Sequence, residues 1–551
     1  MKQAKTSFLK SLLNSLTKAS IINQNPQIND STFRQLENLD SQSRREFIAT
    51  LGLGSLVALN ACKSKNDKKH VDSTRLTTSV ATSYKTKIAI IGGGISGLNC
   101  AYQLKKQGID ATIYEGSKRL GGRILTHYND SLQNGVFPEF GGEFIDSNHE
   151  DMLNLAKEFQ LDLIDFKAET GKLTENTYFF ENTHYTEKDV IQEFKKVASK
   201  IQKDIDSLGE DYDTPDATKL DNTPLSNYVD ELKCSTWLKE LLKSAYVAEF
   251  GLDASEQSTL NFLDMVNTNT KKGFFIYGDS DERYRIKGGN SSLTKAISEK
   301  ISKENIKLEH QLSAIEQVGK SYKLRFTNNT EVEAEYVVLT IPFTILRNIS
   351  LKLSNISSEK KKCIDELGYG MNTKLMLSYE GRPWRDAPNN KLGYLFHKDI
   401  TNGWDGSHNK KEDSIYGIYV CFFGGNFSKT LNDKSFISKY SPPTHTWKNQ
   451  IPDENVNAFV DELDKVFKGS KAKFQNKHVF VNWIDYPFTH SSYSCYKVGQ
   501  WSSISGKEIE PIDNIFFAGE HCSEDFQGYM NGGAETGRRV AENILKLVSK
   551  K

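Results

Sequence analysis

The most regular pattern of hydrophobic positions lies near residue 90, where two apolar runs flank a stretch of helical periodicity. Residues 88–91 read Ile-Ala-Ile-Ile, a continuous apolar run that is typical of a strand buried on both faces. Leu98, Ala101 and Leu104 then recur at the spacing of one helix face. A second apolar run follows at 111–114. The pattern predicts a strand, a helix and a second strand within about 30 residues.

The rest of the chain alternates between amphipathic, apolar and polar stretches. Helical periodicity predicts helices at Asp189–Leu208, Thr236–Phe250 and 531–548. Short apolar runs predict strands at Tyr322–Phe326, Tyr336–Ile341 and Ile515–Ala518. Polar stretches rich in Gly, Asn, Asp or Pro predict loops at 209–227, 385–415 and 424–457. The sequence does not say whether the loops within 385–457 act as a lid.

A glycine pattern lies between the first strand and its helix. Gly92, Gly94 and Gly97 have the spacing G-x-G-x-x-G, which allows a tight turn, close approach of backbone to a pyrophosphate, and close packing of helix on strand. The helix start adds free N–H groups and partial positive charge. Glu115 follows the second strand, where a carboxylate binds ribose hydroxyls and repels a 2′-phosphate. The unit predicts a site for the ADP half of a dinucleotide and disfavours NADP.

Composition and charge narrow the classes of function. The 551 residues include 71 basic and 71 acidic side chains, a balance that gives no reason to expect a nucleic-acid partner. With 37% hydrophobic and 26% charged residues, the chain is typical of a globular protein. Its seven cysteines form no pair or His cluster at metal-ligand spacing, so no metal site is predicted. His149 is interpreted as a satisfied histidine at the surface or at a helix start.

An apolar run upstream of the glycine pattern has the character of a leader. Residues 43–64 read SRREFIATLGLGSLVALNACKS, with two arginines before an apolar run that ends at Cys62. A membrane-spanning helix needs about 20 apolar residues, so this shorter run fits a twin-arginine signal peptide better. Leu59–Cys62 resembles a bacterial lipobox, although Asn60 is unusual there; the alternative is a buried N-terminal helix. We assign 1–61 to a leader and 62–83 to a flexible tether.

Further glycine stretches complete a recognisable set of motifs. They read RLGGR at 119–123, EFGGEFI at 139–145 and FFAGEHCSEDFQGYMNGGAETGRRVA at 516–541. Together with the first glycine pattern, they resemble the flavin-containing amine oxidase family, which includes monoamine, polyamine and L-amino acid oxidases. The resemblance covers roughly residues 85–548 and includes RYRIKGGNSSLTKAI at 283–297 and LGYGMNTKLMLSY at 367–379.

The resemblance implies an α/β fold, in which a Rossmann-like FAD-binding domain of the GR2 type is interleaved with a mixed α+β substrate domain. The FAD domain would comprise 84–147, 283–345 and 492–548, and the substrate domain 148–282 and 346–491. The cofactor would be FAD. The residues that the resemblance assigns to FAD are Gly92, Gly94, Ser96, Gly97, Glu115, Arg123, Gly141, Gly142, Glu143, Leu312, Glu520 and Met530.

These residues have separate implied roles. The first glycine set, including Ser96, would hold the pyrophosphate, and Arg123 would reach a phosphate oxygen. Gly141, Gly142 and Glu143 would pass beside the flavin by their backbone. The backbone of Leu312 would meet the adenine, Glu520 would bind near the ribityl chain, and Met530 would begin a helix aimed at the flavin pyrimidine.

Three residues are implied to address the substrate. Lys374 matches a family lysine that holds a water at flavin N5, and Tyr493 and Tyr529 match two aromatic positions that flank the amine. The implied reaction transfers a hydride equivalent from the amine to the flavin and yields an imine that water hydrolyses to an aldehyde. Molecular oxygen would then reoxidise the flavin and form hydrogen peroxide. The flavin carries the difficult step, and the protein positions and tunes it.

Two departures from the family pattern bear on cofactor and substrate. Monoamine oxidases attach the flavin through a cysteine just before the first cage tyrosine, and this chain has Ser492, so we expect noncovalent FAD. Amino acid oxidases place an arginine after the second glycine stretch, and here Glu143–Asp146 contains none. Acidic groups there favour a cationic amine, although Arg283 or Arg285 could still supply a charge for a carboxylate.

The alternatives therefore remain an L-amino acid oxidase and a flavin-binding redox protein without amine turnover. The implied partners are a small amine or amino acid and O2, with no nucleic acid and no indication of oligomeric state. A twin-arginine route carries folded proteins, so FAD could be inserted before export. The leader predicts a periplasmic or cell-surface protein that is anchored to a membrane through lipidated Cys62 alone.

Overall fold

A computed structural model describes residues 87–551, apart from 129–134, 170–172, 412–413, 432–450 and 550–551. The predicted leader, the tether and Cys62 lie outside the described residues. Within the described part of the chain, no helix has the length and apolarity that a membrane span needs.

A five-stranded parallel sheet carries the glycine pattern. Its order is β18-β11-β1-β2-β7, and its strands are β1 (Ile88–Ile91), β2 (Thr112–Tyr114), β7 (Ile306–Lys307), β11 (Tyr336–Leu339) and β18 (Ile515–Phe517). All three segments predicted for the FAD domain contribute strands. The apolar run of β1 is fully buried, as expected for a strand covered on both faces.

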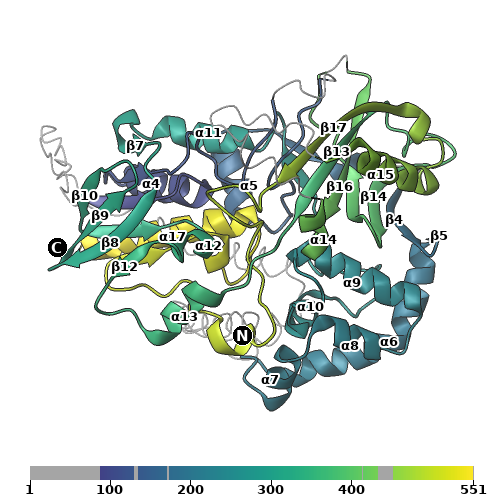
Figure 1. The fold of residues 1–551 in the computed structure, drawn as a ribbon, viewed down its shortest axis with the longest axis horizontal. Helices are drawn as coiled ribbons and strands as arrows, with labels where there is room; N and C mark the ends of the chain where they lie inside the picture. The colour runs from purple at the N-terminus through teal and green to yellow at the C-terminus, as the bar shows by residue number, and fades with distance from the viewer. Residues whose placement is uncertain (1–86, 129–134, 170–172, 412–413, 432–450, 550–551) are drawn as a thin grey trace, which may run out of the picture. The chain divides into compact units, whose positions relative to one another are not determined.

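Two helices pack closely beside this sheet. Helix α4 (Ile95–Lys106) follows the glycine pattern, and α17 (Met530–Val548) lies along it, although more than 400 residues separate the two (Figure 1). Gly537 of α17 lets the helices approach, because a Cβ there would stand 2.3 Å from the carbonyl oxygen of Ser96. The C-terminal helix thereby brings its N-terminus to the cofactor sheet.

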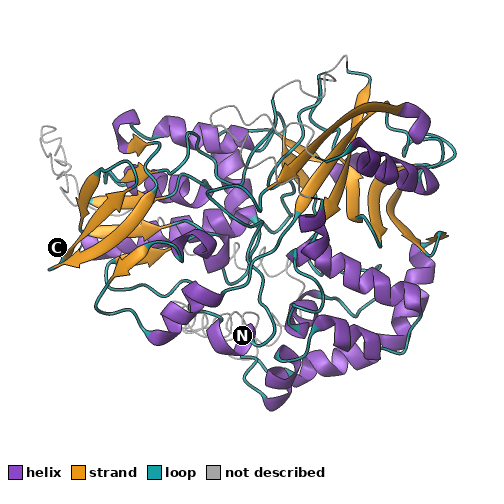
Figure 2. Ribbon diagram, viewed as in Figure 1, coloured by secondary structure: helices purple, strands orange, loops and turns teal. Residues whose placement is uncertain are grey.

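A seven-stranded sheet forms the second layer system (Figure 2). Its order is β17-β13-β16-β15-β14-β4-β5, with β4 (Thr174–Phe180), β5 (Thr183–Tyr185), β13 (Thr373–Glu380), β14 (Lys391–His397), β15 (Thr401–Asp405), β16 (Tyr416–Phe423) and β17 (Phe474–Asn482). Strand β13 is buried along almost its whole length and carries Lys374.

The prediction of a long loop at 385–415 is wrong. Strands β14 and β15 lie inside this range, in the middle of the seven-stranded sheet. Aromatic and aliphatic side chains such as Leu395, Phe396 and Trp404 are buried, and they outweigh the neighbouring Gly and Asn residues that suggested a loop. Part of the second predicted loop, 432–450, lies outside the described residues; its flanks form α14 (Gly425–Thr430) and α15 (Asp453–Val466).

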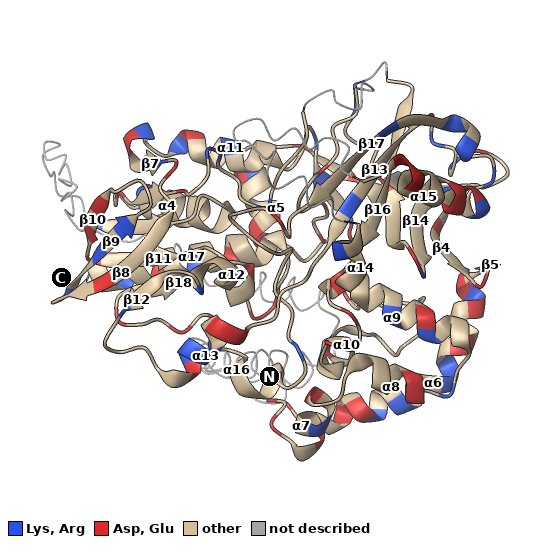
Figure 3. Cartoon of the chain, in the orientation of Figure 1, with Lys and Arg blue, Asp and Glu red and all other residues tan. Residues whose placement is uncertain are grey.

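A helical region follows β5 in the chain. It comprises α6 (Glu187–Ser207), α7 (Pro215–Asp221), α8 (Leu225–Glu231), α9 (Thr236–Phe250) and α10 (Thr259–Met265). The helices predicted at 189–208 and 236–250 are therefore confirmed. The loop predicted at 209–227 is wrong in part, since Thr214 caps α7 and Pro215 occupies its first turn, where proline is compatible with a helix. Figure 3 shows charges of both signs interspersed on these helices.

The remaining elements frame the two large sheets. They are the strands β3 (Leu163–Asp165), β6 (Tyr284–Ile286), β8 (Leu312–Val318), β9 (Ser321–Phe326), β10 (Glu331–Ala334) and β12 (Ser350–Lys352), and the helices α5 (Glu150–Glu158), α11 (Ser291–Lys300), α12 (Phe343–Leu346), α13 (Ser358–Glu366) and α16 (Gln500–Ile504). Because β12 pairs with β8, the predicted boundary at residue 345 cuts through a four-stranded sheet.

Candidate active site

A cavity of about 300 Å³ is lined by residues of both large sheets and by the ends of α9 and α17. Most of the residues predicted from the sequence meet there: Gly92, Gly94, Ser96, Glu115, Arg123, Gly141, Gly142, Glu143, Lys374, Tyr493, Glu520, Tyr529 and Met530. Gly97 lies behind the cavity wall, in the first turn of α4. Leu312 begins β8 within the hydrophobic core and is not among the lining residues.

One end of the cavity has the geometry of a dinucleotide site. Gly92 adopts a φ of +111°, and a Cβ on Gly97 would lie 2.1 Å from the carbonyl oxygen of Gly92. Helix α4 begins without a side-chain cap, so N–H groups of its first turn remain for a ligand. The Ser96 hydroxyl is buried in this wall and has no hydrogen-bond partner in the described protein. These features fit a bound pyrophosphate.

Glu115 is fixed beside the same turn. Its carboxylate accepts hydrogen bonds from the backbone N–H groups of Gly93, at 2.7 Å, and Ser117, at 2.8 Å. Each carboxylate oxygen can accept more than one hydrogen bond, so capacity remains for ribose hydroxyls.

Arg123 and Glu520 form an ion pair further along the cavity. Arg123 Nη1 donates to Glu520 Oε1 at 3.0 Å and to the carbonyl oxygen of Ser492 at 2.6 Å. The hydroxyl of Ser494 and the N–H of Gly528 also donate to Glu520. Although burial by itself would raise the pKa of Glu520, Arg123 and these donors hold it below its usual range. A charged carboxylate thus stands at the cavity, near the uncapped N-terminus of α17.

Lys374 projects from β13 to the second glycine stretch. Its ammonium donates to Glu143 Oε2 at 2.7 Å, to the carbonyl oxygen of Gly141 at 2.9 Å and to that of Glu139 at 3.0 Å. Asn290 supports this stretch from behind, since its amide donates to the carbonyl oxygens of Gly142 and Glu143. Sequence reasoning missed Asn290, because an asparagine before a helix is ordinarily interpreted as a cap.

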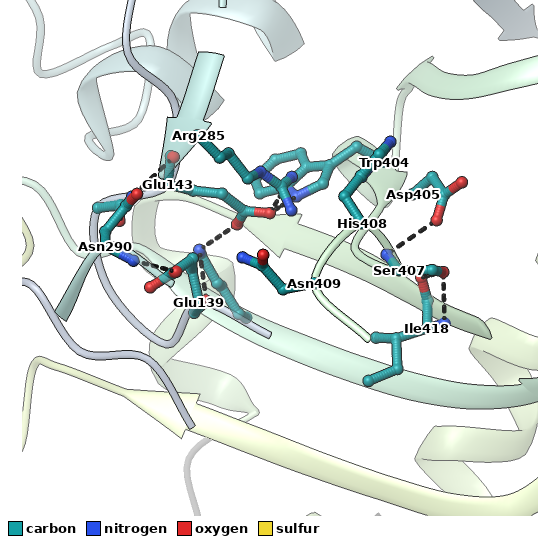
Figure 4. Close-up of polar contacts among 12 residues, drawn as sticks. Glu139, Glu143, Arg285, Asn290, Trp404, Asp405, Ser407, His408, Asn409 and Ile418 are labelled. Carbon is teal, nitrogen blue, oxygen red and sulfur yellow. Dashed lines mark hydrogen bonds and ion pairs between the residues drawn. The ribbon is translucent and has the colours of Figure 1, made fainter. Parts of the chain in front are cut away.

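The side chain of Glu143 has a role that the sequence did not reveal. We expected only its backbone to matter, yet its carboxylate pairs with both Lys374 and Arg285 (Figure 4). Burial would raise the pKa of Glu143, but the two cations hold it below its usual range. Glu139 lies nearby without such a cation, and burial raises its pKa to about 7.

The two arginines considered for a substrate carboxylate are engaged elsewhere. Arg283 pairs with Asp165 at 2.8 Å, and Arg285 is 1% exposed and pairs with Glu143. Among the residues that line the cavity, the cations are Arg123 and Lys374, and each is paired with a carboxylate. The expectation that Arg283 or Arg285 could meet a carboxylate therefore finds no support in the geometry.

The two predicted cage tyrosines lie at the other end of the cavity. Tyr493 donates to the carbonyl oxygen of Ala248 at 3.0 Å, and Tyr529 donates to Glu249 Oε1 at 2.7 Å. His149 packs its ring against Tyr529, with ring centroids 5.2 Å apart. His149 begins α5 as predicted, but the alternative of a surface position is wrong because it is 1% exposed. Burial lowers its pKa to about 4.

Three carboxyl groups gather near Tyr529. Burial raises the pKa of Asp146 to about 6 and that of Glu249 to about 7. Burial, together with Asp146 and Glu249, also raises the pKa of Glu282 well above its usual value. Sequence reasoning noted Asp146 and missed the other two, because Glu249 ends an amphipathic helix and Glu282 lies in an irregular segment, where nothing distinguishes them from surface residues.

Comparison with known proteins agrees with this site. Residues 95–545 match the model of the family described as flavin containing amine oxidoreductase. The chain belongs to this family. It is 23% identical over 485 residues to amine oxidase [flavin-containing] A of Sus scrofa, and 22% identical over 485 residues to amine oxidase [flavin-containing] B of Homo sapiens. These alignments cover 84% and 85% of this chain, and 85% and 88% of the two relatives.

Solved structures show the same fold. An engineered putrescine oxidase superposes with a TM-score of 0.68 at 18% identity, and cyclohexylamine oxidase from Brevibacterium oxydans IH-35A with 0.67 at 20% identity. Each comparison covers 84% of this chain and 99% of the other. The predicted fold class is thus confirmed.

Membership of the family establishes the cofactor and the class of reaction. The protein is an FAD-dependent oxidoreductase that acts on the C–N groups of amines with oxygen as acceptor. Ser492 stands at the position of flavin attachment, and its hydroxyl donates to Asn372 at 2.6 Å. Because Ser492 has no thiol, the expectation of noncovalent FAD stands.

Proposed function

We propose that this protein oxidises aliphatic diamines, releasing an aldehyde and hydrogen peroxide. The observation that carries the proposal is the charge of the cavity: three carboxyl groups (Asp146, Glu249 and Glu282) lie near the cage tyrosines, while both lining cations are already paired. A second ammonium group on the substrate would balance those carboxylates. The solved putrescine oxidase, which has been captured with putrescine, supports a diamine.

The chain's own residues divide the work between the two ends of the substrate. When bound, FAD supplies the two-electron oxidation of the amine to an imine. Tyr493 and Tyr529 stay neutral phenols, because burial raises their pKa values well above the usual range, and their rings can flank the reacting nitrogen. The carboxyls beside Tyr529 would hold the distant ammonium and so orient the chain of the substrate.

An L-amino acid is the less favoured substrate. Its α-carboxylate would enter a cavity whose acidic groups repel it and whose cations are paired. A flavin protein without turnover would show no reduction by any amine, so the same experiment tests it.

Three substrates that differ by one group separate these possibilities. Cadaverine is expected to be oxidised with a higher kcat/KM than pentylamine, which lacks the second ammonium, and than L-lysine, which adds a carboxylate. In the Glu249→Gln variant the preference for cadaverine over pentylamine should fall about tenfold, since a charged hydrogen bond is lost. Peroxide release reports each rate. Glu299→Gln, on an exposed helix face, is the matched control.

The same preference should depend on pH. Asp146 and Glu249 bind an ammonium when ionised, and their pKa values are about 6 and 7. Selectivity for cadaverine should therefore be present above pH 7 and lost as the pH falls below 6. Faster turnover of L-lysine than of cadaverine would contradict the diamine proposal.

We also propose that residues 43–62 direct export and that Cys62 carries a lipid anchor. The proposal is supported by the arginine pair, the short apolar run and the lipobox-like Leu59–Cys62. A single acyl chain binds membranes weakly, so a stable anchor would need several chains. Fractionation of cells is expected to move the Cys62→Ser variant from the membrane to the soluble fraction, and an unchanged distribution would refute the anchor.

A further inference from the structure

Glu143 touches both ends of the reaction site with one carboxylate. Its Oε2 accepts from Lys374 Nζ at 2.7 Å, and its Oε1 accepts from the indole N–H of Trp404 at 2.8 Å. Arg285 pairs with the same Oε1 from the far side (Figure 4). Glu143 is buried, so each of these contacts acts in a weakly screened setting.

The contact with Lys374 completes the coordination of an ammonium group. A lysine ammonium has three N–H donors, and all three find acceptors in the protein: two backbone carbonyls and Glu143. The carbonyls belong to the glycine stretch and are fixed by the backbone. Glu143 is the one acceptor on a side chain, and it alone carries a charge, so it determines where the third N–H points.

The contact with Trp404 reaches the wall that faces the substrate. Trp404 lines the cavity and packs against Phe422 and Phe144, with ring centroids 5.2 Å and 5.4 Å apart. Its neighbours restrict the indole from its faces, whereas the hydrogen bond to Glu143 fixes its rotation in the plane of the ring. Loss of that bond would leave a buried indole N–H without its acceptor.

Arg285 makes this arrangement possible. Its guanidinium lies over Phe144 and Phe166, at 4.9 Å and 4.6 Å from their ring centroids, and it is almost fully buried. A buried carboxylate needs close countercharges, and Lys374 and Arg285 provide them from opposite sides. Arg285 does not line the cavity, so it acts through Glu143 and not on a substrate.

We propose that Glu143 is a positioning residue that sets Lys374 and Trp404 together, with Arg285 as its structural counterion. This inference rests on the proposed amine oxidation and deepens it. It predicts that one substitution impairs two separable steps: the reaction with oxygen, through Lys374, and the binding of the amine, through Trp404.

The test compares Glu143→Gln with Trp404→Phe. A glutamine side chain keeps the shape but presents N–H donors to groups that are themselves donors. In Glu143→Gln the rate constant for oxygen should fall about tenfold and the KM for cadaverine should rise about tenfold. Trp404→Phe removes only the indole N–H, so it should raise KM while its oxygen rate constant stays within about twofold of the wild type.

A double variant separates position from charge. Glu143→Gln with Arg285→Met has the same net charge as the wild type, yet Lys374 and Trp404 still lack their shared acceptor. Both defects should persist in the double variant. Recovery of both values to the wild-type level would overturn the proposal, because charge balance alone would then explain the single variant. A defect of Glu143→Gln in only one of the two steps would overturn it as well.

Two further readouts guard the interpretation. The FAD dissociation constant, measured by fluorescence on the FAD-free protein, should change by less than about threefold in Glu143→Gln, since its carboxylate contacts protein groups. A much larger loss would mean that Glu143 acts by holding FAD. The oxygen step is measured on enzyme reduced by light, so it remains testable even if the wild type oxidises no amine and the proposed function fails.

Discussion

Replacing Lys374 by methionine is expected to slow the reaction of the reduced enzyme with oxygen about 100-fold, while FAD remains bound. The ammonium is held at the cavity wall by Glu143 and two carbonyls, so its positive charge stands in a fixed place. Oxygen acquires negative charge as it is reduced, and a preorganised cation in a site with little water stabilises that charge. Stopped-flow mixing of reduced enzyme with oxygen measures the effect.

A second substitution at the same position provides the control. Lys374→Arg keeps the charge but cannot place its planar guanidinium on three acceptors arranged for an ammonium, so it should recover part of the rate. Oxygen kinetics that are unchanged in Lys374→Met would rule out the assigned role. A loss of FAD from Lys374→Met would instead show that the lysine is structural.

The cofactor half of the site was the more predictable half. The dinucleotide turn depends on local features, namely glycines where φ is positive or a Cβ would clash, and a carboxylate at a strand end. Gly92 and Glu115 are therefore recognisable within about 30 residues of sequence. The core strands β1 and β11 were similarly visible, because parallel strands buried on both faces have continuous apolar runs.

The substrate half depends on contacts between distant segments. Tyr529 meets Glu249 across 280 residues, and Lys374 meets Glu143 across 231. Neither glutamate differs, in its local sequence, from an ordinary solvated residue. Their burial and charge partners arise only when the sheets and helices assemble, so pattern analysis could not find them.

The errors in secondary structure have a related cause. Strands β14 and β15 contain glycine and asparagine, and their stability comes from neighbouring strands and from buried aromatic residues such as Trp404. Strand propensity depends on that context more than helix propensity does. A central pair of strands was therefore mistaken for a surface loop.

Gly97→Ala is expected to weaken FAD binding at least about 100-fold. A Cβ at this position would stand 2.1 Å from the carbonyl oxygen of Gly92 and 3.1 Å from the Thr340 hydroxyl. The nearer contact is with backbone, which cannot rotate away, so α4 must move off the turn that follows β1. That movement displaces the N–H groups at the start of α4, which are the predicted ligands of the pyrophosphate. Fluorescence titration of the FAD-free protein gives the dissociation constant.

Gly108→Ala, just beyond the other end of the same helix, separates this effect from general loss of stability. Gly108 has a φ of +75° and nothing within 4 Å of a Cβ, so alanine there costs only backbone strain, about 1 kcal/mol. We expect Gly108→Ala to lower the thermal unfolding temperature slightly and to leave FAD affinity unchanged. If Gly97→Ala bound FAD as tightly as Gly108→Ala, the close contact between α4 and the turn would not be what forms the pyrophosphate site.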